Sequence, residues 1–233
     1  MHMVDLVVFD HDGTLVNSLP VVVEASNTVM AAFGYGAKPP AEIVAGMVHA
    51  TAPRLGLLAG TLDVGLQQRM AKRYGELALA SSELAVLYPG IETMLRDLHG
   101  MGLPMAVLSN SEGIFVCTIT ERLDVAKYFF RLTGEDDMPK PKPDPQGLLR
   151  ILEVSKCEAR RAVYVGDSRT DLETAWSAGT KAIGVTWGAH RRVELEALGF
   201  DALIDEPSRL VALLNDSSLG DPCRPWTARL IPR

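Results

Sequence analysis

The sequence predicts an α/β fold, in which a parallel sheet is covered by helices on both faces and an all-helical segment is inserted after the first strand. After Tyr88, short apolar runs alternate with helical segments, and such alternation builds a parallel sheet with right-handed crossovers. Residues 19–84 are rich in Ala, Leu, Val and Met at helical spacing and contain no convincing strand. With 233 residues, of which 47% are hydrophobic, the chain can bury a full core.

Local residue patterns indicate where each predicted element near the N-terminus begins or ends. The first strand is the apolar run 6–9. The helix that follows begins at Leu19 behind Asn17 or Ser18, which suit the N-cap position, and it ends at the helix-breaking segment GYGAKPP. The inserted segment is predicted to contain one helix over 19–33, shorter helices within 41–59 and a longer helix over 62–80.

Turn and capping residues mark the ends of helices in the part of the chain where strands and helices alternate. Asp144 and Pro145 supply an N-cap and a first-turn pair for one helix, and Gly179 closes another. The predicted strands are 104–108, 129–133, 161–165 and 181–185. The predicted helices are 91–99, 113–123, 145–154 and 170–178. The resulting domains are a core domain of residues 1–17 and 86–215, a helical cap domain of residues 18–85, and an irregular C-terminal tail of residues 216–233.

Composition excludes several classes of function. The formal net charge of −6 argues against non-specific binding to nucleic acids or membrane surfaces. Cys117, Cys157 and Cys223 are scattered and form no CxxC pair, so neither a zinc site nor a disulfide framework is expected. The N-terminal residues do not resemble a signal peptide, and no run of about 18 apolar residues suggests a membrane span. We therefore expect a cytoplasmic protein without a nucleic-acid or membrane partner.

Two acids follow the first strand directly. Asp10 and Asp12 stand two residues apart, and side chains with this spacing on an extended strand point the same way. Both carboxylates can therefore meet at the carboxyl end of the strand, where open α/β sheets bind ligands. On its own, the segment Asp-His-Asp-Gly-Thr fits an ordinary turn equally well, because Asp and Gly favour turns. The other strand ends decide between these two interpretations.

Further polar side chains follow the later strands. Ser109 and Asn110 follow the second parallel strand, while Asp167 and Asp171, one helical turn apart, follow a later one. Lys140 lies in the proline-rich loop between these two groups. Because consecutive right-handed crossovers bring the strand ends to one edge of the sheet, we expect these side chains to lie close together.

Electrostatics decides what such a cluster can hold. Two like charges about 4 Å apart repel each other by roughly 4 kcal/mol at an effective dielectric of about 20. The clustered carboxylates therefore need a cation or protons. Because all candidate ligands are oxygens, without clustered Cys or His, the expected ion is Mg²⁺. Mg²⁺ commonly binds phosphate oxygens, which indicates a phosphorylated substrate.

Five segments together resemble a known family. They are FDHDGTLVNS, VLSNS, KPKPDP, GDSRTDLETAWSAG and VTWGAH. Their order and spacing are similar to the motifs of the haloacid dehalogenase-like hydrolase (HAD) superfamily, within its phosphoglycolate phosphatase-like branch. The resemblance covers about residues 4–214, and it implies a Rossmann-like core domain with a helical cap domain.

The resemblance implies a phosphatase mechanism at the matching positions. Asp10 would attack phosphorus and form an aspartyl-phosphate, and Asp12 would protonate the leaving group and then deprotonate a water. Mg²⁺ would be held by the carboxylates of Asp10 and Asp167 and by the main-chain carbonyl of Asp12. Asp171 would lie at the edge of the metal site.

The same resemblance implies which groups bind the phosphoryl group. Ser109 and the amide of Asn110 would bind phosphate oxygens, and a lysine would offset the charge that develops there. The family pattern Lys-Pro-x-Pro-Asp fits residues 140–144. For this reason Lys140 is preferred over Lys142 as the catalytic lysine.

Other candidate substrate-binding residues come from the first motif and from the inserted segment. Gly13 and Thr14 directly follow the two acids. His49 and Arg54 lie where caps of this family send a specificity loop toward the site, although each fits a solvated surface residue as well. His11 departs from the family pattern, which has an apolar or aromatic residue there. It is either a substrate contact or a packed or solvated histidine.

The leading hypothesis is a magnesium-dependent phosphatase for a small phosphomonoester such as 2-phosphoglycolate, because Asp12 supplies the proton donor that phosphoryl chemistry needs. A phosphomutase similar to β-phosphoglucomutase shares the motifs and would require a sugar bisphosphate. A non-enzymatic phosphate sensor is the third alternative, although every catalytic acid is present. The expected partner is a small phosphorylated metabolite, and the chain is expected to be a monomer or a homodimer.

Overall fold

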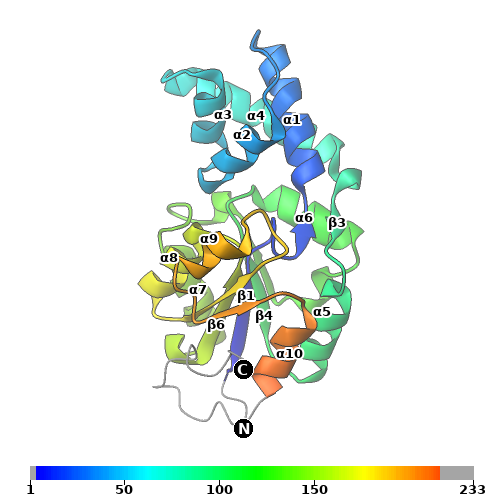
Figure 1. Cartoon of the computed structure of the whole chain (residues 1–233), viewed down its shortest axis with the longest axis vertical. Coiled ribbons are helices and arrows are strands. Elements are labelled where there is room, and N and C mark those ends of the chain that lie inside the picture. The colour runs from blue at the N-terminus through cyan, green and yellow to red at the C-terminus, as the bar shows by residue number, and fades with distance from the viewer. Residues whose placement is uncertain (1–3, 216–233) are drawn as a thin grey trace.

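The core of the protein is a six-stranded parallel sheet (Figure 1). The computed structural model describes residues 4–215. In sheet order, the strands are β5 (Arg131–Thr133), β4 (Met105–Leu108), β1 (Leu6–Phe9), β6 (Ala162–Gly166), β7 (Lys181–Val185) and β8 (Ala202–Ile204). Every neighbouring pair is parallel. Because β1 lies between β4 and β6, the residues that follow these three strands are neighbours at one edge of the sheet.

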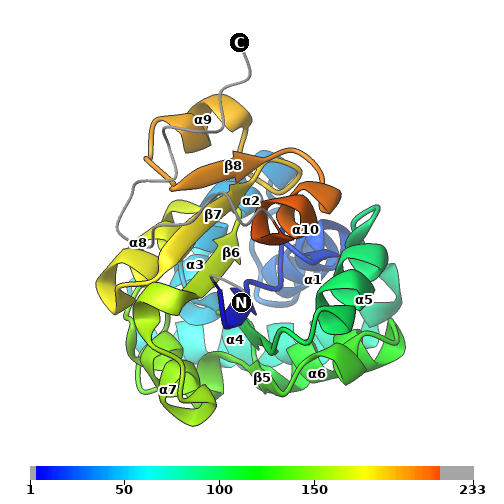
Figure 2. The same ribbon diagram turned by 90° about the horizontal axis from the view of Figure 1, so that it is seen from below.

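Helices cover both faces of the sheet because its strands are apolar on both sides (Figure 2). On β1, Val7 and Phe9 face one layer, whereas Leu6 and Val8 face the other. The helices on the first face are α5 (Ile91–Gly100), α6 (Gly113–Arg122) and α10 (Ser208–Asn215). Those on the second face are α7 (Gln146–Ser155), α8 (Arg169–Ala178) and α9 (Arg192–Glu196). Short 3₁₀ turns over Ala126–Tyr128, Glu135–Asp137 and Ala159–Arg161 complete the connections.

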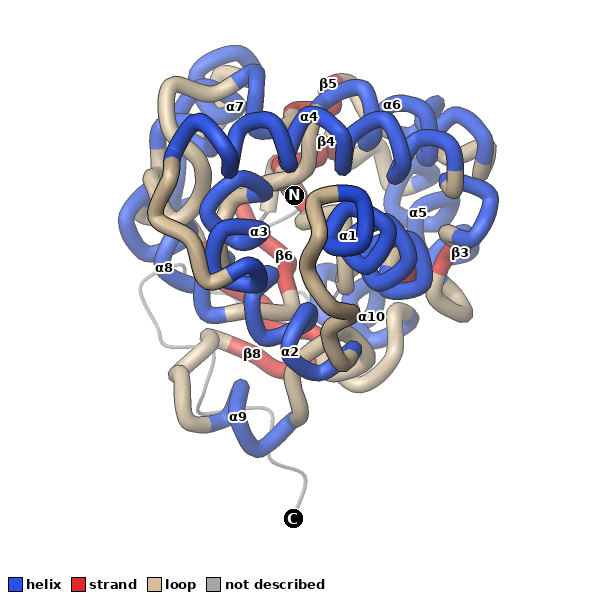
Figure 3. The backbone as a smooth tube through the Cα atoms, turned by 90° about the horizontal axis from the view of Figure 1, so that it is seen from above, coloured by secondary structure: helices blue, strands red, loops and turns tan. Residues whose placement is uncertain are grey.

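Four helices form the cap, a layer above the carboxyl ends of the strands (Figures 1 and 3). They are α1 (Leu19–Ala32), α2 (Pro40–Ala45), α3 (Thr51–Ala59) and α4 (Val64–Ala80), with 3₁₀ turns over Gly46–Val48 and Ser82–Leu84. Met30, Leu55 and Met70 are fully buried in this layer. The chain enters the cap after β2 (Val16–Asn17) and leaves it before β3 (Val86–Leu87). These two short strands pair with each other antiparallel.

The structure confirms the predicted fold class, and each predicted strand and helix has a counterpart. The helix expected behind Asp144 begins at Gln146, whose N–H donates to the Asp144 carboxylate at 3.0 Å. The strands and α-helices that sequence patterns missed are the two-residue strands β2 and β3, together with β8, α9 and α10, which follow the last predicted strand. The domain boundaries remain a prediction, and the predicted tail lies outside the described residues. Within 4–215, no helix is long and apolar enough to cross a membrane.

Candidate active site

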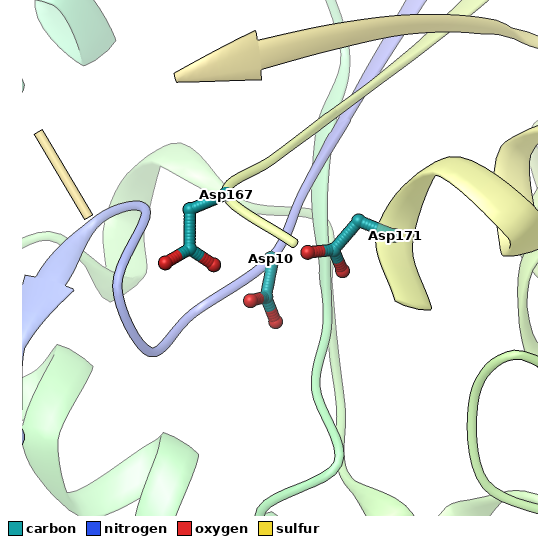
Figure 4. A group of neighbouring side chains, drawn as sticks. All are labelled: Asp10, Asp167 and Asp171. Atoms are coloured by element: carbon teal, nitrogen blue, oxygen red, sulfur yellow. The ribbon is translucent and has the colours of Figure 1, made fainter. Parts of the chain in front are cut away.

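Three carboxylates meet at the carboxyl edge of the sheet. Asp10 directly follows β1, Asp167 directly follows β6, and Asp171 lies in the first turn of α8. Figure 4 shows Asp10 between the other two, and one carboxylate oxygen from each lies within 4.8 Å of the others. All three side chains are buried. The structure thus brings together the acids that the sequence places at separate strand ends.

Burial and mutual repulsion disfavour the charged forms of this cluster. Burial and the neighbouring Asp171 raise the pKa of Asp10 well above its usual value. The same two causes raise the pKa of Asp167 to about 7. A cation bound among the carboxylates would relieve this repulsion.

The donor set fits a hard divalent cation, because every offered ligand is a carboxylate oxygen. In Asp10, Oδ1 accepts a hydrogen bond, and in Asp167, Oδ2 accepts the N–H of Ala189 at 2.7 Å. Among the hydrogen bonds of residues 4–215, the second oxygen of each carboxylate receives no donor. These two oxygens are therefore available to a metal ion.

Lys142, rather than Lys140, reaches the acidic cluster. Its Nζ lies 2.7 Å from Oδ1 of Asp10 and 2.7 Å from Oδ1 of Asp171, and its side chain is 3% exposed. Burial lowers the pKa of Lys142, but the two carboxylates outweigh burial and hold it well above the usual value. The Lys140 side chain is 69% exposed, and its amine lies 3.9 Å from Asp144. The prediction of Lys140 is therefore wrong, because the loop turns the second lysine of the Lys-Pro-Lys-Pro segment inward.

The side chain of Asn110 explains which lysine turns inward. Its Oδ1 accepts the N–H of Lys142 at 2.8 Å, and its Nδ2 donates to the carbonyl of the same residue at 3.0 Å. Tyr164 completes the lysine pocket, since its hydroxyl accepts from Nζ at 3.0 Å and donates to the Leu108 carbonyl at 3.0 Å. Because the Asn110 side chain is already used, a phosphate contact of this residue would come from its backbone N–H.

Asp171 uses both of its oxygens within the protein. Oδ1 accepts from Lys142, while Oδ2 accepts from the N–H of Ser168 at 3.1 Å and from its hydroxyl at 2.6 Å. With Ser168 it forms the capping box of α8. Asp171 therefore anchors the lysine and the helix at the edge of the cluster, and Asp10 and Asp167 offer the open oxygens.

Hydroxyl groups surround the Asp12 carboxylate. Ser18 donates to Oδ1, Ser111 donates to Oδ2 at 2.7 Å, and the Ser109 hydroxyl lies 3.3 Å from Oδ2. Burial raises the pKa of Asp12, but His11 and the hydrogen bonds outweigh burial and hold the pKa well below its usual range. Asp12 is therefore an ionised carboxylate in the free protein.

His11 is packed inside the protein. It is fully buried, its Nδ1 lies 3.3 Å from Oδ1 of Asp12, and its ring meets Phe115 edge to face at 6.2 Å between centroids. Of the interpretations that the sequence left open, the structure favours the packed histidine.

Comparison with known proteins assigns the family. Residues 7–185 match the family model of the haloacid dehalogenase-like hydrolases. The chain belongs to this family. Among curated proteins, the phosphoglycolate phosphatase of Pseudomonas fluorescens (strain Pf0-1) is 32% identical over 214 residues, which cover 88% of this chain and 78% of that protein. The phosphoglycolate phosphatase of Vibrio parahaemolyticus is 30% identical over 219 residues, which cover 91% of this chain and 96% of that protein.

Solved structures share the fold of this haloacid dehalogenase-like hydrolase. A haloacid dehalogenase-like hydrolase from Bacteroides fragilis superposes with a TM-score of 0.84 at 24% identity, covering 89% of this chain and 99% of that one. A haloacid dehalogenase-like family protein from Streptococcus pneumoniae gives a TM-score of 0.81 at 19% identity, covering 91% of this chain and 98% of that one.

The strand ends of the hydrolase and its cap enclose a cavity of about 80 Å³. The acids, hydroxyl residues and lysine described above that line its core side are Asp10, Asp12, Asp167, Ser109, Ser111, Ser168 and Lys142. The cap residues that line it are Val22, Met47, His49, Thr51, Arg54 and Tyr74. The cap residues His49 and Arg54 thus lie where the sequence places them, on the wall that faces the strand ends.

Gly13 and Thr14 are not among the residues that line the cavity. Gly13 has a φ of +83°, and a Cβ at this position would lie 2.3 Å from Oδ2 of Asp167. The glycine therefore lets the first motif turn tightly against the carboxylate. Thr14 is 1% exposed, and its carbonyl accepts the indole N–H of Trp187 at 2.9 Å. Neither position supports the predicted substrate contact.

Ser111, Tyr164 and Tyr74 are among the side chains of the site that escaped sequence reasoning. Ser111 stands two residues after Ser109, and this spacing was the available signal for a second hydroxyl facing the same way. Tyr164 carries a hydroxyl in an otherwise apolar strand, and a buried tyrosine hydroxyl usually has a hydrogen-bond partner. Tyr74 has no such signal, because an aromatic residue at helical spacing in the cap looks like an ordinary core residue.

Proposed function

We propose that this hydrolase is a magnesium-dependent phosphatase that cleaves a small phosphomonoester, such as 2-phosphoglycolate, through an aspartyl-phosphate intermediate. The observation that carries the proposal is the setting of Asp10. One oxygen of this buried carboxylate accepts a hydrogen bond from Lys142, and Asp10 lines a cavity that Asp12 also lines. The phosphoglycolate phosphatases among its relatives support a phosphomonoester as substrate.

The size of the cavity supports a small substrate. Its volume is about 80 Å³, which gives room for roughly five to eight water-sized groups at about 10–15 Å³ each. A phosphoester of two or three carbon atoms fits this volume.

The carboxylates of Asp10 and Asp167 would hold the magnesium ion, with the main-chain carbonyl of Asp12 as a third ligand. The bound ion would supply positive charge that offsets both the clustered carboxylates and the phosphoryl oxygens. Asp171 keeps Lys142 in place next to Asp10, where the ammonium would add a second fixed positive charge.

The reaction follows from the groups that face the cavity. Asp10 attacks phosphorus and forms an oxygen–phosphorus bond while the ester bond to the alcohol breaks. The departing alkoxide takes a proton from Asp12, and Asp12 then takes a proton from the water that hydrolyses the aspartyl-phosphate. Inorganic phosphate leaves, and Asp10 is regenerated. Ser109 and the backbone N–H of Asn110 hold phosphoryl oxygens during both steps.

Asp12 must gain a proton before it can act as an acid. In the free protein its pKa is held well below its usual range, which suits the base of the second step. The phosphoryl group brings negative charge close to this carboxylate, and a nearby like charge raises a carboxyl pKa. Substrate binding therefore prepares Asp12 for its acid role.

The proposal is tested by phosphate release from a panel of phosphomonoesters, with Mg²⁺ and with a chelator. We expect release from small esters with Mg²⁺ and its loss with the chelator. Replacing the nucleophile, Asp10→Asn, should lower kcat by roughly 10³-fold or more. The exposed acid variant Asp97→Asn serves as the matched control and should retain activity.

Two outcomes of the panel would contradict a phosphatase. Turnover that requires an added sugar bisphosphate would indicate a phosphomutase instead. Tight binding of phosphoesters without release of phosphate would indicate a sensor.

Location and assembly are further parts of the proposal. We infer a cytoplasmic enzyme that acts as a monomer or a homodimer on a small phosphorylated metabolite. The scattered cysteines and the net charge of −6 support this inference. Cell fractionation and light scattering of the purified chain would test it.

A further inference from the structure

Arg54 is a buried charge without a counter-ion. The residue is 5% exposed, and its Nε has no hydrogen-bond partner. No carboxylate of the described residues lies within ion-pair distance of its guanidinium. Charged side chains that are buried this deeply are normally paired, because an unpaired buried charge is costly. An anion bound in the cavity that Arg54 lines would balance its charge.

The cap holds the Arg54 side chain in one place. Its guanidinium carbon lies 4.7 Å from the centroid of the Tyr74 ring, in cation–π contact. The aliphatic part of the Arg54 side chain lies close to Gly46, since a Cβ at Gly46 would lie 3.1 Å from Cγ of Arg54. Gly46 thus leaves space that the arginine stem fills. A group fixed in this way loses little conformational entropy when it binds a ligand.

The guanidinium faces the same cavity as the catalytic acids. Arg54 and Tyr74 line its cap wall, and Asp10 lies on its core side. Burial raises the pKa of the nearby Glu135, a backbone hydrogen bond from Thr51 opposes this rise, and the charge of Arg54 lowers that pKa less than the hydrogen bond does. Glu135 forms no ion pair with Arg54, so the cavity itself is where a counter-ion fits.

We propose that Arg54 determines specificity by binding a carboxylate at the end of the substrate remote from the phosphate. This proposal rests on the proposed phosphatase function. The phosphoryl end of such an ester lies against Asp10 and Lys142, and the other end meets Arg54 across the small cavity. The counter-ion of Arg54 is thus supplied by the substrate.

The charges of the cavity favour a carboxylate over a second phosphate. Among the residues that line it, Lys142 and Arg54 are the Lys and Arg side chains. Lys142 is already bound by two carboxylates, so one unpaired guanidinium remains. A carboxylate balances it with a single negative charge and matches its planar fork. A second phosphate would bring additional charge that no further lysine or arginine of the cavity neutralises.

The test compares 2-phosphoglycolate with its carboxamide analogue, which has the same shape but no charge at the remote end. We measure kcat and KM for both esters with the full chain and Mg²⁺. The wild-type protein is expected to favour the carboxylate ester by about 10- to 100-fold in kcat/KM. In Arg54→Gln this preference should fall toward one, mainly through KM for the carboxylate ester. Arg54→Lys, which keeps the charge but not the fork, should retain part of the preference.

Arg73→Gln is the matched control. Arg73 belongs to the same cap, its side chain is 49% exposed, and it pairs with Glu76 at 2.7 Å. This variant should keep the wild-type preference. Thermal unfolding of each variant checks that the cap is folded.

A binding measurement makes the test independent of turnover. Calorimetry of 2-phosphoglycolate and of the carboxamide is carried out with wild-type protein and with Arg54→Gln. Equal affinity of wild type for the two esters, an unchanged preference in Arg54→Gln, or stronger binding of a bisphosphate would each overturn the assignment. The absence of phosphate release from every ester, combined with an Arg54-dependent preference in binding, would contradict the phosphatase function and leave the carboxylate site supported.

Discussion

Lys142 lies between two buried carboxylates, so three charges share one water-poor space. The ammonium compensates part of the repulsion between Asp10 and Asp171, and the carboxylates keep it protonated. A buried pair of this kind adds little net stability, but removing one partner leaves unbalanced charge. The lysine is therefore needed for the positions of the acids, and the proposed chemistry uses the same positive charge.

Replacing this lysine by a neutral side chain of similar length, Lys142→Met, is expected to impair both properties. We expect kcat to fall about 10²- to 10³-fold, because a fixed positive charge next to the reacting phosphoryl group is lost. The metal-free protein should lose about 3 kcal/mol of unfolding free energy, because Asp10 and Asp171 remain buried without their partner. Steady-state kinetics and urea unfolding measure the two effects.

Lys140→Met provides the comparison for that experiment. Its side chain is largely exposed, so stability should change by less than about 0.5 kcal/mol and activity should be retained. A larger loss of activity in Lys140→Met than in Lys142→Met would contradict the assignment.

At the scale of the elements, the site is made by the short turns at the strand ends. The turn after β1 brings Gly13 against the Asp167 carboxylate, which follows a different strand. The backbone of this turn and the Asp167 side chain can thus lie close together because the glycine leaves room. The spacing of the carboxylate cluster depends on this turn.

Gly13→Ala should therefore damage the site through two effects. Its positive φ strains any residue with a Cβ, and the added methyl group would collide with Asp167. We expect a loss of about 2–4 kcal/mol in unfolding free energy, together with loss of Mg²⁺ binding measured by calorimetry.

Gly34→Ala separates the strain from the collision. Gly34 has a φ of +82°, nearly the same as Gly13, but a Cβ there meets nothing within 4 Å. This variant should cost only about 1 kcal/mol and should bind Mg²⁺ normally. If both variants cost the same and both bind the metal, the packing of Gly13 against Asp167 is not what fixes the cluster.

The elements also show how far sequence reasoning extends. The strands and the acids at their ends were predictable, because buried strands appear as apolar runs and side chains two residues apart point the same way. The choice between Lys140 and Lys142 was not, because it depends on a contact between Asn110 and a backbone more than 30 residues away. The edge strand β8 was missed because three residues carry too little periodicity. The position of Arg54 in the cavity was not predictable either, because it depends on the packing of the whole cap.

At the scale of the whole molecule, folding gathers charges that stay apart in the unfolded chain. The pKa of Asp167 rises from an ordinary value of 3.8 to about 7 in the metal-free folded protein. The folded state therefore holds this proton more tightly than the unfolded state does. The contribution of Asp167 to stability is present at low pH and is lost as pH rises through about 7.

Mg²⁺ should therefore stabilise the protein more at pH 8 than at pH 6, because a proton on Asp167 competes with the ion. At a Mg²⁺ concentration about 100 times its dissociation constant, the gain is about 2.7 kcal/mol, or roughly 5–11 °C for a chain of this size. Thermal unfolding with Mg²⁺ and with a chelator at both pH values measures this gain. In Asp167→Asn the gain should be smaller and should lose most of its pH dependence. An equal gain at both pH values in the wild-type protein would contradict the competition.

The strands β2 and β3 pair with each other where the chain passes between the sheet and the cap. Both passages of the chain between sheet and cap run through one short antiparallel ribbon, in which Asn17 stands opposite Val86. The start and the end of the cap are therefore neighbours in space, and segments with adjacent ends can be inserted or exchanged without disturbing their host. The sheet carries Asp10, Asp167 and Asp171, and the cap carries Arg54. Exchange of the cap at this one ribbon would therefore change the proposed substrate contact and leave the three carboxylates in place.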